Sequence, residues 1–211
     1  MNRSELRSTI RETLPDHSIW SDTMLNTWIG SAIRSYSVYF PLQTSSEIAC
    51  STGIRTYSLL GLDGLRGVLR VAYPAGENAR WLLRWSEQAV SKGLPVYALR
   101  GEPPHTLLLG PEVKDGESVE ILYLADYPLP SNDQVDLGLP EVAVELVSLY
   151  VLWQSARRLE MQAASEPLGN TYPEAVAWQT SRNLQQAYHN LIESLLSRQA
   201  PGGYSGPWKD E

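Results

Sequence analysis

The sequence predicts an α+β fold, in which a bundle of about four helices carries a small antiparallel β unit inserted between the second and third long helices. Apolar residues recur at helical spacing near both ends of the 211-residue chain, and alternating segments separated by turn residues occupy its middle. The last residues are rich in Gly and Pro and show no period. We therefore expect a single domain over residues 1–199, made of helical parts 1–45 and 138–199 and a β-rich insertion 46–137, followed by an extended C-terminal tail 200–211.

Two helices are predicted before the insertion. The first covers Ser4–Thr13, with Ser4 as its N-cap residue. The second begins at Asp22, also a good N-cap residue, and ends before Pro41. The apolar residues of the second helix follow the spacing of one helix face: Leu25, Trp28, Ile29, Ala32, Ile33 and Tyr36. This pattern predicts an amphipathic helix with a wide apolar stripe.

Short β strands are predicted from about Tyr57 onward. In the stretch LRGVLRVAYP, a face that carries Arg66 and Arg70 alternates with an apolar face formed by Leu65, Gly67, Leu69 and Val71. Between Glu77 and Val90 the spacing changes to i, i+4 and i+8 at Trp81, Trp85 and Ala89. This spacing predicts a short helix that lies on the sheet.

The stretch Thr106–Pro128 predicts a β-hairpin around a turn at Asp115 and Gly116. The residues Leu107–Leu109 make its first strand apolar on both faces, so we expect that strand to be covered on both sides. In the second strand one face is shared by Val119, Ile121 and Tyr123. The hairpin carries no catalytic pattern, so its role is predicted to lie in the surface that it presents.

Two helices are predicted after the insertion. The stretch Val142–Trp153 is apolar almost all round, and such a helix is either central in its own fold or covered by a neighbouring subunit. Because the chain has few other elements to wrap this helix, we favour subunit contact through Leu146, Leu149, Tyr150 and Trp153. The last helix, from about Pro173 to Ser197, is expected to pack against it as an antiparallel hairpin. The tail holds Tyr204 and Trp208, which suit either a frayed terminus or a docking peptide.

Charge and residue types argue against several kinds of chemistry. A net charge of −7 argues against a basic patch that clamps phosphates, and the single cysteine, Cys50, excludes an internal disulfide. The sequence shows no metal-ligand, phosphate-loop or nucleophile spacing, so we expect no enzyme activity, no metal and no cofactor. Its longest apolar run is too short to cross a bilayer, and we expect no membrane contact. The four arginines of the insertion fit either a basic strip near nucleic acid or a surface that is salt-bridged to a neighbour: Arg66, Arg70, Arg80 and Arg84. The acidic balance of the whole chain favours the second interpretation.

The order of these segments resembles that of the head-to-tail connector, or adaptor, proteins of tailed bacteriophages. The resemblance rests on the helix WSDTMLNTWIGSAIRSYSVYFP, the piece TYSLLGLDGLRGVLRVAYP and the strands LLLGP and VEILYLADYP. It also rests on the helix LPEVAVELVSLYVLWQSARRLE and the final helix, so that it extends from about Ser4 to Ser197. None of these segments is a tight catalytic signature.

The resemblance implies a structural protein of the virion neck, synthesised in the host cytoplasm. It implies a ring, expected to have twelve subunits, that joins the portal protein to a downstream tail or neck protein. DNA would pass through the lumen of the ring without sequence-specific binding. The tail segment with Tyr204 and Trp208 would reach the portal, and the tip at Asp115 and Gly116 would face the next ring.

Two other functions stay open on the sequence. One is another neck or tail component, such as a tail terminator or a baseplate protein. The other is a small enzyme or ligand-binding domain that uses the β unit as a pocket, near Trp81, Arg84 and Trp85.

Overall fold

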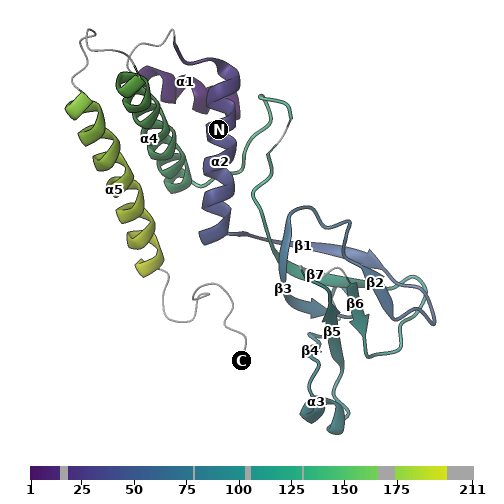
Figure 1. Ribbon diagram of the computed structural model, residues 1–211. Coiled ribbons are helices and arrows are strands. Elements are labelled where there is room, and N and C mark those ends of the chain that lie inside the picture. Colours follow the sequence, from purple (N-terminus) through teal and green to yellow (C-terminus); the bar gives the residue numbers. More distant parts are fainter. Residues whose placement is uncertain (15–18, 78, 103–105, 130, 166–173, 199–211) are drawn as a thin grey trace. The chain divides into compact units, whose positions relative to one another are not determined.

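A computed structural model describes residues 1–14, 19–77, 79–102, 106–129, 131–165 and 174–198. This described part has a mixed α+β structure with five helices and two sheets, which agrees with the predicted fold class. The chain divides into two compact units: a helical unit formed by Met1–Phe40 and Tyr127–Glu211, and a β unit formed by Pro41–Asp126 (Figure 1). The β unit, Pro41–Asp126, therefore begins and ends earlier in the chain than the predicted insertion, 46–137.

The helical unit begins with α1 (Arg3–Thr13), whose N-cap residue is Asn2. The Asn2 side chain accepts a hydrogen bond from the backbone N–H of Glu5 at 2.9 Å, and the Glu5 carboxylate accepts one from the N–H of Asn2 at 3.0 Å. This reciprocal pair is a capping box, which satisfies two N–H groups that have no partner within the helix. The predicted cap, Ser4, is wrong, because Ser4 already lies inside the first turn.

The second helix, α2 (Asp22–Tyr39), confirms the predicted amphipathic helix. Its cap is Ser21, whose hydroxyl accepts from the N–H of Met24 at 3.3 Å, rather than the predicted Asp22. Asp22 is instead the first helical residue, where its carboxylate lies near the positive end of the helix dipole. The apolar stripe is fully buried at Leu25, Ile29 and Ile33.

The two C-terminal helices are α4 (Glu141–Ser165) and α5 (Glu174–Arg198). They run antiparallel to each other and in contact, and α4 also packs against α2 (Figure 1). The predicted antiparallel pair is thus confirmed. The helix α4 has neighbours on two sides within the same chain. The burial of apolar side chains on more than one of its faces therefore needs no second subunit.

The β unit contains two sheets. The first has the order β1-β7-β3, and all of its neighbouring strands are antiparallel: β1 (Leu42–Ala49), β7 (Ser118–Ala125) and β3 (Leu65–Ala72). The second has the order β2-β6-β5-β4: β2 (Thr56–Ser58), β6 (Thr106–Leu109), β5 (Val96–Arg100) and β4 (Leu83–Arg84). Side chains from both sheets form one apolar core.

The predicted hairpin between β6 and β7 is wrong, because these strands belong to different sheets. The strand β6 pairs with β2 and β5, and β7 pairs with β1 and β3. The turn itself is present, with Gly116 at a φ of 81°. The prediction failed because a turn signal does not determine which strands pair. The strand that lies beside β7, β1, reads LQTSSEIA and is too polar to stand out as a strand.

The buried face of β7 follows the predicted pattern, but β6 is fully buried on one face only, because Leu108 on its other face is partly exposed. Val119, Ile121 and Tyr123 are buried on one face of β7, and Leu107 and Leu109 are buried in β6. In β3 the register shifts twice, between Leu65 and Gly67 and between Val68 and Arg70. These bulges bring Val68 and Val71 into the core in place of the strict alternation that the sequence predicts.

The predicted helix between Glu77 and Val90 is also wrong over most of its length. Trp81 forms a β bridge with Ala72, the short strand β4 pairs in parallel with β5, and only α3 (Glu87–Ser91) is helical. An i, i+4 spacing of tryptophans fits an extended strand as well as a helix, because both place these positions on one face. The backbone N–H of Leu82 donates to the carbonyl of Val71 at 2.8 Å, and this pairing favours the extended form.

The core of the β unit predicts a large cost for Ile121→Ala. Ile121 is fully buried, so truncation leaves a cavity and should lower the free energy of unfolding by about 2–5 kcal/mol. Urea unfolding followed by tryptophan fluorescence measures this change. The matched control is Leu60→Ala, because Leu60 is 74% exposed in the same unit and should change stability by no more than about 0.5 kcal/mol. Equal effects of the two substitutions would contradict the assigned core.

Candidate functional site

The residues predicted to form a subunit interface lie on α4, between α2 and α5. Leu146 is only 2% exposed, and it belongs to an apolar cluster with Tyr36, Ala143, Tyr188 and Ile192. Residues of the same chain are therefore enough to bury Leu146. Leu149, Tyr150 and Trp153 are partly exposed, and their part in a subunit contact stays a prediction.

An aromatic cluster joins α4 to α5. The ring of Tyr150 lies 5.6 Å from the rings of both Trp153 and Tyr188, and Trp153 stacks on Tyr188 at 6.1 Å. Ser35 on α2 shares a hydrogen bond of 2.9 Å with the Tyr188 hydroxyl. Burial raises the pKa of Tyr188, so its hydroxyl stays protonated and suits a structural hydrogen bond. This cluster fixes α5 against α4, with Tyr188 buried and with Tyr150 and Trp153 partly exposed.

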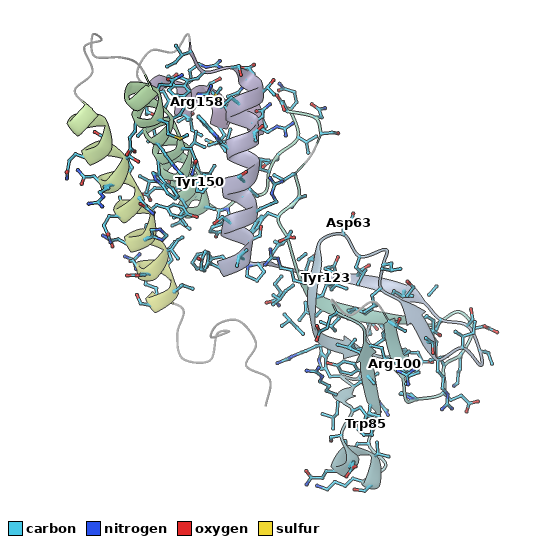
Figure 2. All side chains as sticks on the ribbon, viewed as in Figure 1. Asp63, Trp85, Arg100, Tyr123, Tyr150 and Arg158 are labelled. Carbon is cyan, nitrogen blue, oxygen red and sulfur yellow. The ribbon has the colours of Figure 1, made fainter. Side chains whose placement is uncertain are left out.

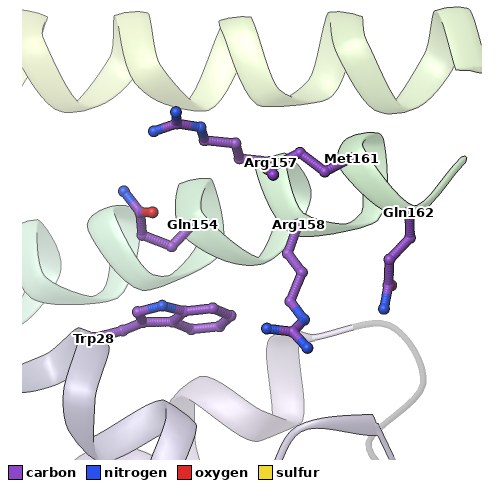
Figure 3. A pocket seen from close by; sticks show the side chains of 6 residues that line it. All are labelled: Trp28, Gln154, Arg157, Arg158, Met161 and Gln162. Atoms are coloured by element: carbon purple, nitrogen blue, oxygen red, sulfur yellow. The ribbon is translucent and has the colours of Figure 1, made fainter. Parts of the chain in front are cut away.

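A groove of about 480 Å³ opens on the helical unit between α2 and the C-terminal half of α4. It is lined by Trp28, Gln154, Arg157, Arg158, Met161 and Gln162 (Figure 3). Arg158 extends from α4 towards the side where Trp28 lies, and Arg157 extends towards α5 (Figure 3). Within the described ranges, neither arginine forms an ion pair. The groove offers positive charge, two amides and an indole ring, which can hold an acidic group of a partner but supply no acid and base pair.

The N-terminal helix is tied to the segment 131–137 by ion pairs. Asp133 accepts hydrogen bonds from Arg3 at 2.6 Å and from Arg7 at 2.8 Å, and Asp136 binds the N-terminal amino group at 3.1 Å. The hydrogen bonds from Arg7 and Arg3 hold the pKa of the Asp133 carboxyl below its ordinary value. Asp22 adds a second anchor, with Arg11 at 2.6 Å. These carboxylates have structural partners, and none is positioned for acid-base catalysis.

Asp115, at the predicted hairpin tip, pairs with another loop of the β unit. Its side chain accepts from the N–H of Thr52 at 2.8 Å, and its own N–H donates to the Thr52 hydroxyl at 3.0 Å. Asp115 and Gly116 are both exposed, so the turn remains available to a partner. The structure thus gives Asp115 a local role in joining two loops, and its contact with a tail protein stays a prediction.

Buried titratable groups in the β unit also serve the fold. The Tyr73 hydroxyl donates to the Glu117 carboxylate and accepts from the N–H of Lys114, and burial raises the pKa of Tyr73 to about 12. Burial likewise raises the pKa of the Cys50 thiol, which lies in the apolar core. A thiol in its protonated form is a weak nucleophile, so Cys50 fills space rather than reacts.

The four arginines that sequence analysis grouped together have different surroundings. Arg66 pairs with Asp126, and the guanidinium of Arg70 lies over the ring of Trp81 at 5.8 Å. Arg80 and Arg84 are exposed. Arg66 could therefore form the predicted salt bridge to a neighbouring molecule only if its ion pair with Asp126 were broken. The other three arginines remain available for contact with a second molecule.

The remaining predicted site residues, Tyr204 and Trp208, lie outside the described residues. Among the residues that the structure describes, no group of three or more His, Cys, Asp or Glu side chains could hold a metal ion. In the same residues, no helix combines the length and the apolar character needed to cross a membrane.

Sequence reasoning missed three features of the helical unit. The Asp133 ion pairs join residues that are far apart in the chain, and no local pattern predicts such pairing. The groove likewise combines α2 with α4, although the Arg157 and Arg158 pair next to polar glutamines was a visible signal of an open polar face. The capping box was also visible, as Asn2 followed three residues later by Glu5.

Comparison with models of protein families matches residues 1–208 to the family described as SU10 adaptor protein. The match includes the helical unit, the β unit and most of the C-terminal segment, so it extends over the whole architecture rather than one fragment of it. A search of curated proteins finds no match.

The Asp133 ion pairs predict a specific pH dependence. A carboxyl whose pKa is lowered in the folded state stabilises the fold above its ordinary pKa of 3.8, and that contribution is lost as the pH falls through the folded value. We expect the free energy of unfolding of the natural protein to fall more steeply on acidification from about pH 5 to pH 2 than that of Asp133→Asn. Urea unfolding at a series of pH values measures both curves. Parallel curves would show that Asp133 does not contribute.

Proposed function

The chain belongs to the SU10 adaptor protein family, and we propose that this phage structural adaptor acts as a head-to-tail connector. Copies of the chain form a ring that joins the portal protein to a downstream tail or neck protein. The observation that carries the proposal is the family match over residues 1–208, which takes in both units of the chain.

The two-unit architecture supports a connecting role. An adaptor must contact at least two different assemblies, and each contact needs its own surface. The helical unit and the β unit have separate apolar cores, so substitutions on one surface need not disturb the other. In the proposed ring, the Asp115 and Gly116 turn of the β unit faces the tail side.

The proposed ring, with twelve copies expected, closes through contacts between neighbouring helical units. The partly exposed rim of α4 supports this arrangement, with Leu149, Tyr150 and Trp153 next to the buried Leu146. A heterologous contact needs no symmetric pair, and it closes into a ring when its repeated rotation adds up to a full turn.

The role that we propose involves no catalysis and no cofactor. Tyr188, Tyr73 and Asp133 have structural hydrogen-bond partners, and Cys50 lies in the apolar core. DNA passes through the lumen without sequence-specific binding. The net charge of −7 supports this, because retention of DNA requires neutralisation of its phosphates by Lys and Arg.

Binding to the portal tests the proposed function. We expect the purified full chain, mixed with the portal protein of the same phage, to form rings on the portal in negative-stain electron microscopy. The chain alone should be monomeric or weakly associated. Portal particles that carry no added ring at saturating concentrations of the chain would contradict the proposal.

Deletion of Ala200–Glu211 tests the proposed docking role of the C-terminal tail. This segment follows the last described helix, so its removal should leave the melting temperature unchanged and weaken binding to the portal by at least about tenfold, as expected when aromatic anchors are lost. The full-length control Tyr204→Ala with Trp208→Ala should show the same weakening. A much lower melting temperature after deletion would show that the tail is part of the fold.

A further inference from the structure

Exposed apolar side chains gather at the edge of the four-stranded sheet in the β unit. Trp81 is 49% exposed, Leu83 47% and Trp85 56%. Val90 in α3 and Leu94 just after it are also exposed, and Trp85 lies next to α3 (Figure 2). We call these five residues the Trp81 surface. Single exposed apolar residues are ordinary, but a group of five, two of them tryptophans, is typical of an interaction site.

The backbone holds the Trp81 surface in one arrangement. Successive side chains of an extended segment point to opposite sides, and Leu82 is buried in the core, so Trp81 and Leu83 point away from it. The N–H of Leu83 donates to the carbonyl of Pro95 at 3.0 Å, and that of Trp85 to the carbonyl of Tyr97 at 2.7 Å. Little ordering is therefore needed when a partner binds, which favours affinity.

The Trp81 surface lies in the most basic part of an acidic chain. Residues 66–100 contain six basic residues (Lys and Arg) and two acidic residues (Asp and Glu), which gives a net charge of +4. The rest of the chain contains eleven basic and 22 acidic residues, which gives a net charge of −11. Such separation of charge within one chain makes one copy electrostatically complementary to another.

Three arginines give this charge to the surface itself. The guanidinium of Arg70 lies over the Trp81 ring at 5.8 Å, and Arg80 and Arg84 are exposed beside the tryptophans in sequence. In the described part of the chain, no carboxylate forms an ion pair with any of the three. An apolar centre with unpaired cations around it fits an acidic protein surface that also carries apolar side chains.

We propose that the Trp81 surface binds an acidic surface of the neighbouring copy of this chain. The inference rests on the proposed ring and adds to it a second contact between copies, made by the β unit. The contact is heterologous, because the basic surface of one copy meets a different, acidic surface of the next. A nucleic acid would also suit arginines and tryptophans, and the experiment below includes it as an outcome.

Site-specific crosslinking tests which molecule lies against the Trp81 surface. The one natural cysteine, Cys50, is buried, so an added surface cysteine can be labelled selectively. Gln88→Cys in α3 places a benzophenone maleimide next to the surface without removal of either tryptophan, and Leu60→Cys is the control because Leu60 is 74% exposed outside this surface. Each labelled full chain is assembled on the portal in the presence of DNA and then irradiated.

We expect an adduct between two copies of the chain from position 88 and not from position 60. Two outcomes would overturn the inference and leave the proposed ring unaffected. In the first, rings form but position 88 crosslinks only to the portal or to DNA. In the second, position 88 crosslinks to another copy no more than position 60 does. If no ring forms with the unmodified chain, the proposed function fails and the inference fails with it.

A substitution gives a second, independent readout. Trp81→Ser with Trp85→Ser should keep the melting temperature, since both side chains are about half exposed, and should weaken association between copies by about 30-fold or more, the size expected for loss of an anchoring tryptophan. Leu60→Ser is the control and should change association by less than about threefold. Because the chain alone is expected to be monomeric or weakly associated, sedimentation velocity of ring assembly on the portal measures both. Unchanged association of the double variant would overturn the inference even if crosslinks form.

Discussion

The chain leaves the helical unit after Phe40 and returns to it at Tyr127, and the rest of the structure depends on how these two crossings are held together. Ser37 is fully buried, and its hydroxyl donates to the carbonyl of Ile33 at 2.8 Å and accepts from the N–H of Tyr127 at 3.1 Å. The rings of Tyr36 and Tyr127 lie 5.5 Å apart. On the β side, Leu42 pairs with Ala125 at the ends of β1 and β7. Because both crossings are fixed side by side, a whole β unit can be inserted without separation of the helices that flank it.

The helices of the helical unit were predicted well, and the strand pairing of the β unit was not, for one physical reason. Helical periodicity is local, so the buried stripe of α2 at Leu25, Ile29 and Ile33 can be seen in the sequence. Strand pairing depends on residues that are distant in the chain. β1 has only Leu42, Ile48 and Ala49 as apolar residues, so nothing in it indicated that it would pair with β7, which lies in a different sheet from β6. The same limit explains why Asp133 gave no sign of its arginine partners.

Two patterns in the sequence fit more than one structure. The spacing of Trp81 and Trp85 fits one face of a helix and one face of a strand, and the hydrogen bond from Leu82 to Val71 favours the strand. The apolar circumference of α4 fits burial by a second subunit and burial by α5, and the position of Leu146 between α2 and α5 favours the second for that residue. In each case the local sequence is compatible with both structures, and contacts with distant parts of the chain favour one of them.

The distribution of chemistry over the chain suits a connecting role. Groups that could react have partners that keep them inert: Tyr73 has Glu117, and Asp133 has Arg3 and Arg7. Arginines that form no ion pair within the described residues lie near indole rings in both units: Arg157 and Arg158 line the groove with the half-buried Trp28, and Arg70 lies over the ring of Trp81. These surfaces suit contacts with other proteins, in agreement with the SU10 adaptor protein family.

We propose that this adaptor forms a ring between the portal and the tail of its phage. A cryo-electron microscopy reconstruction of the neck in intact particles is the decisive test, because the helical unit and the two-sheet β unit can be fitted separately into the density. We expect a closed ring of copies directly below the portal, with the helical and β units present in each copy. Density for this chain at the baseplate or at the distal end of the tail, and none below the portal, would contradict it.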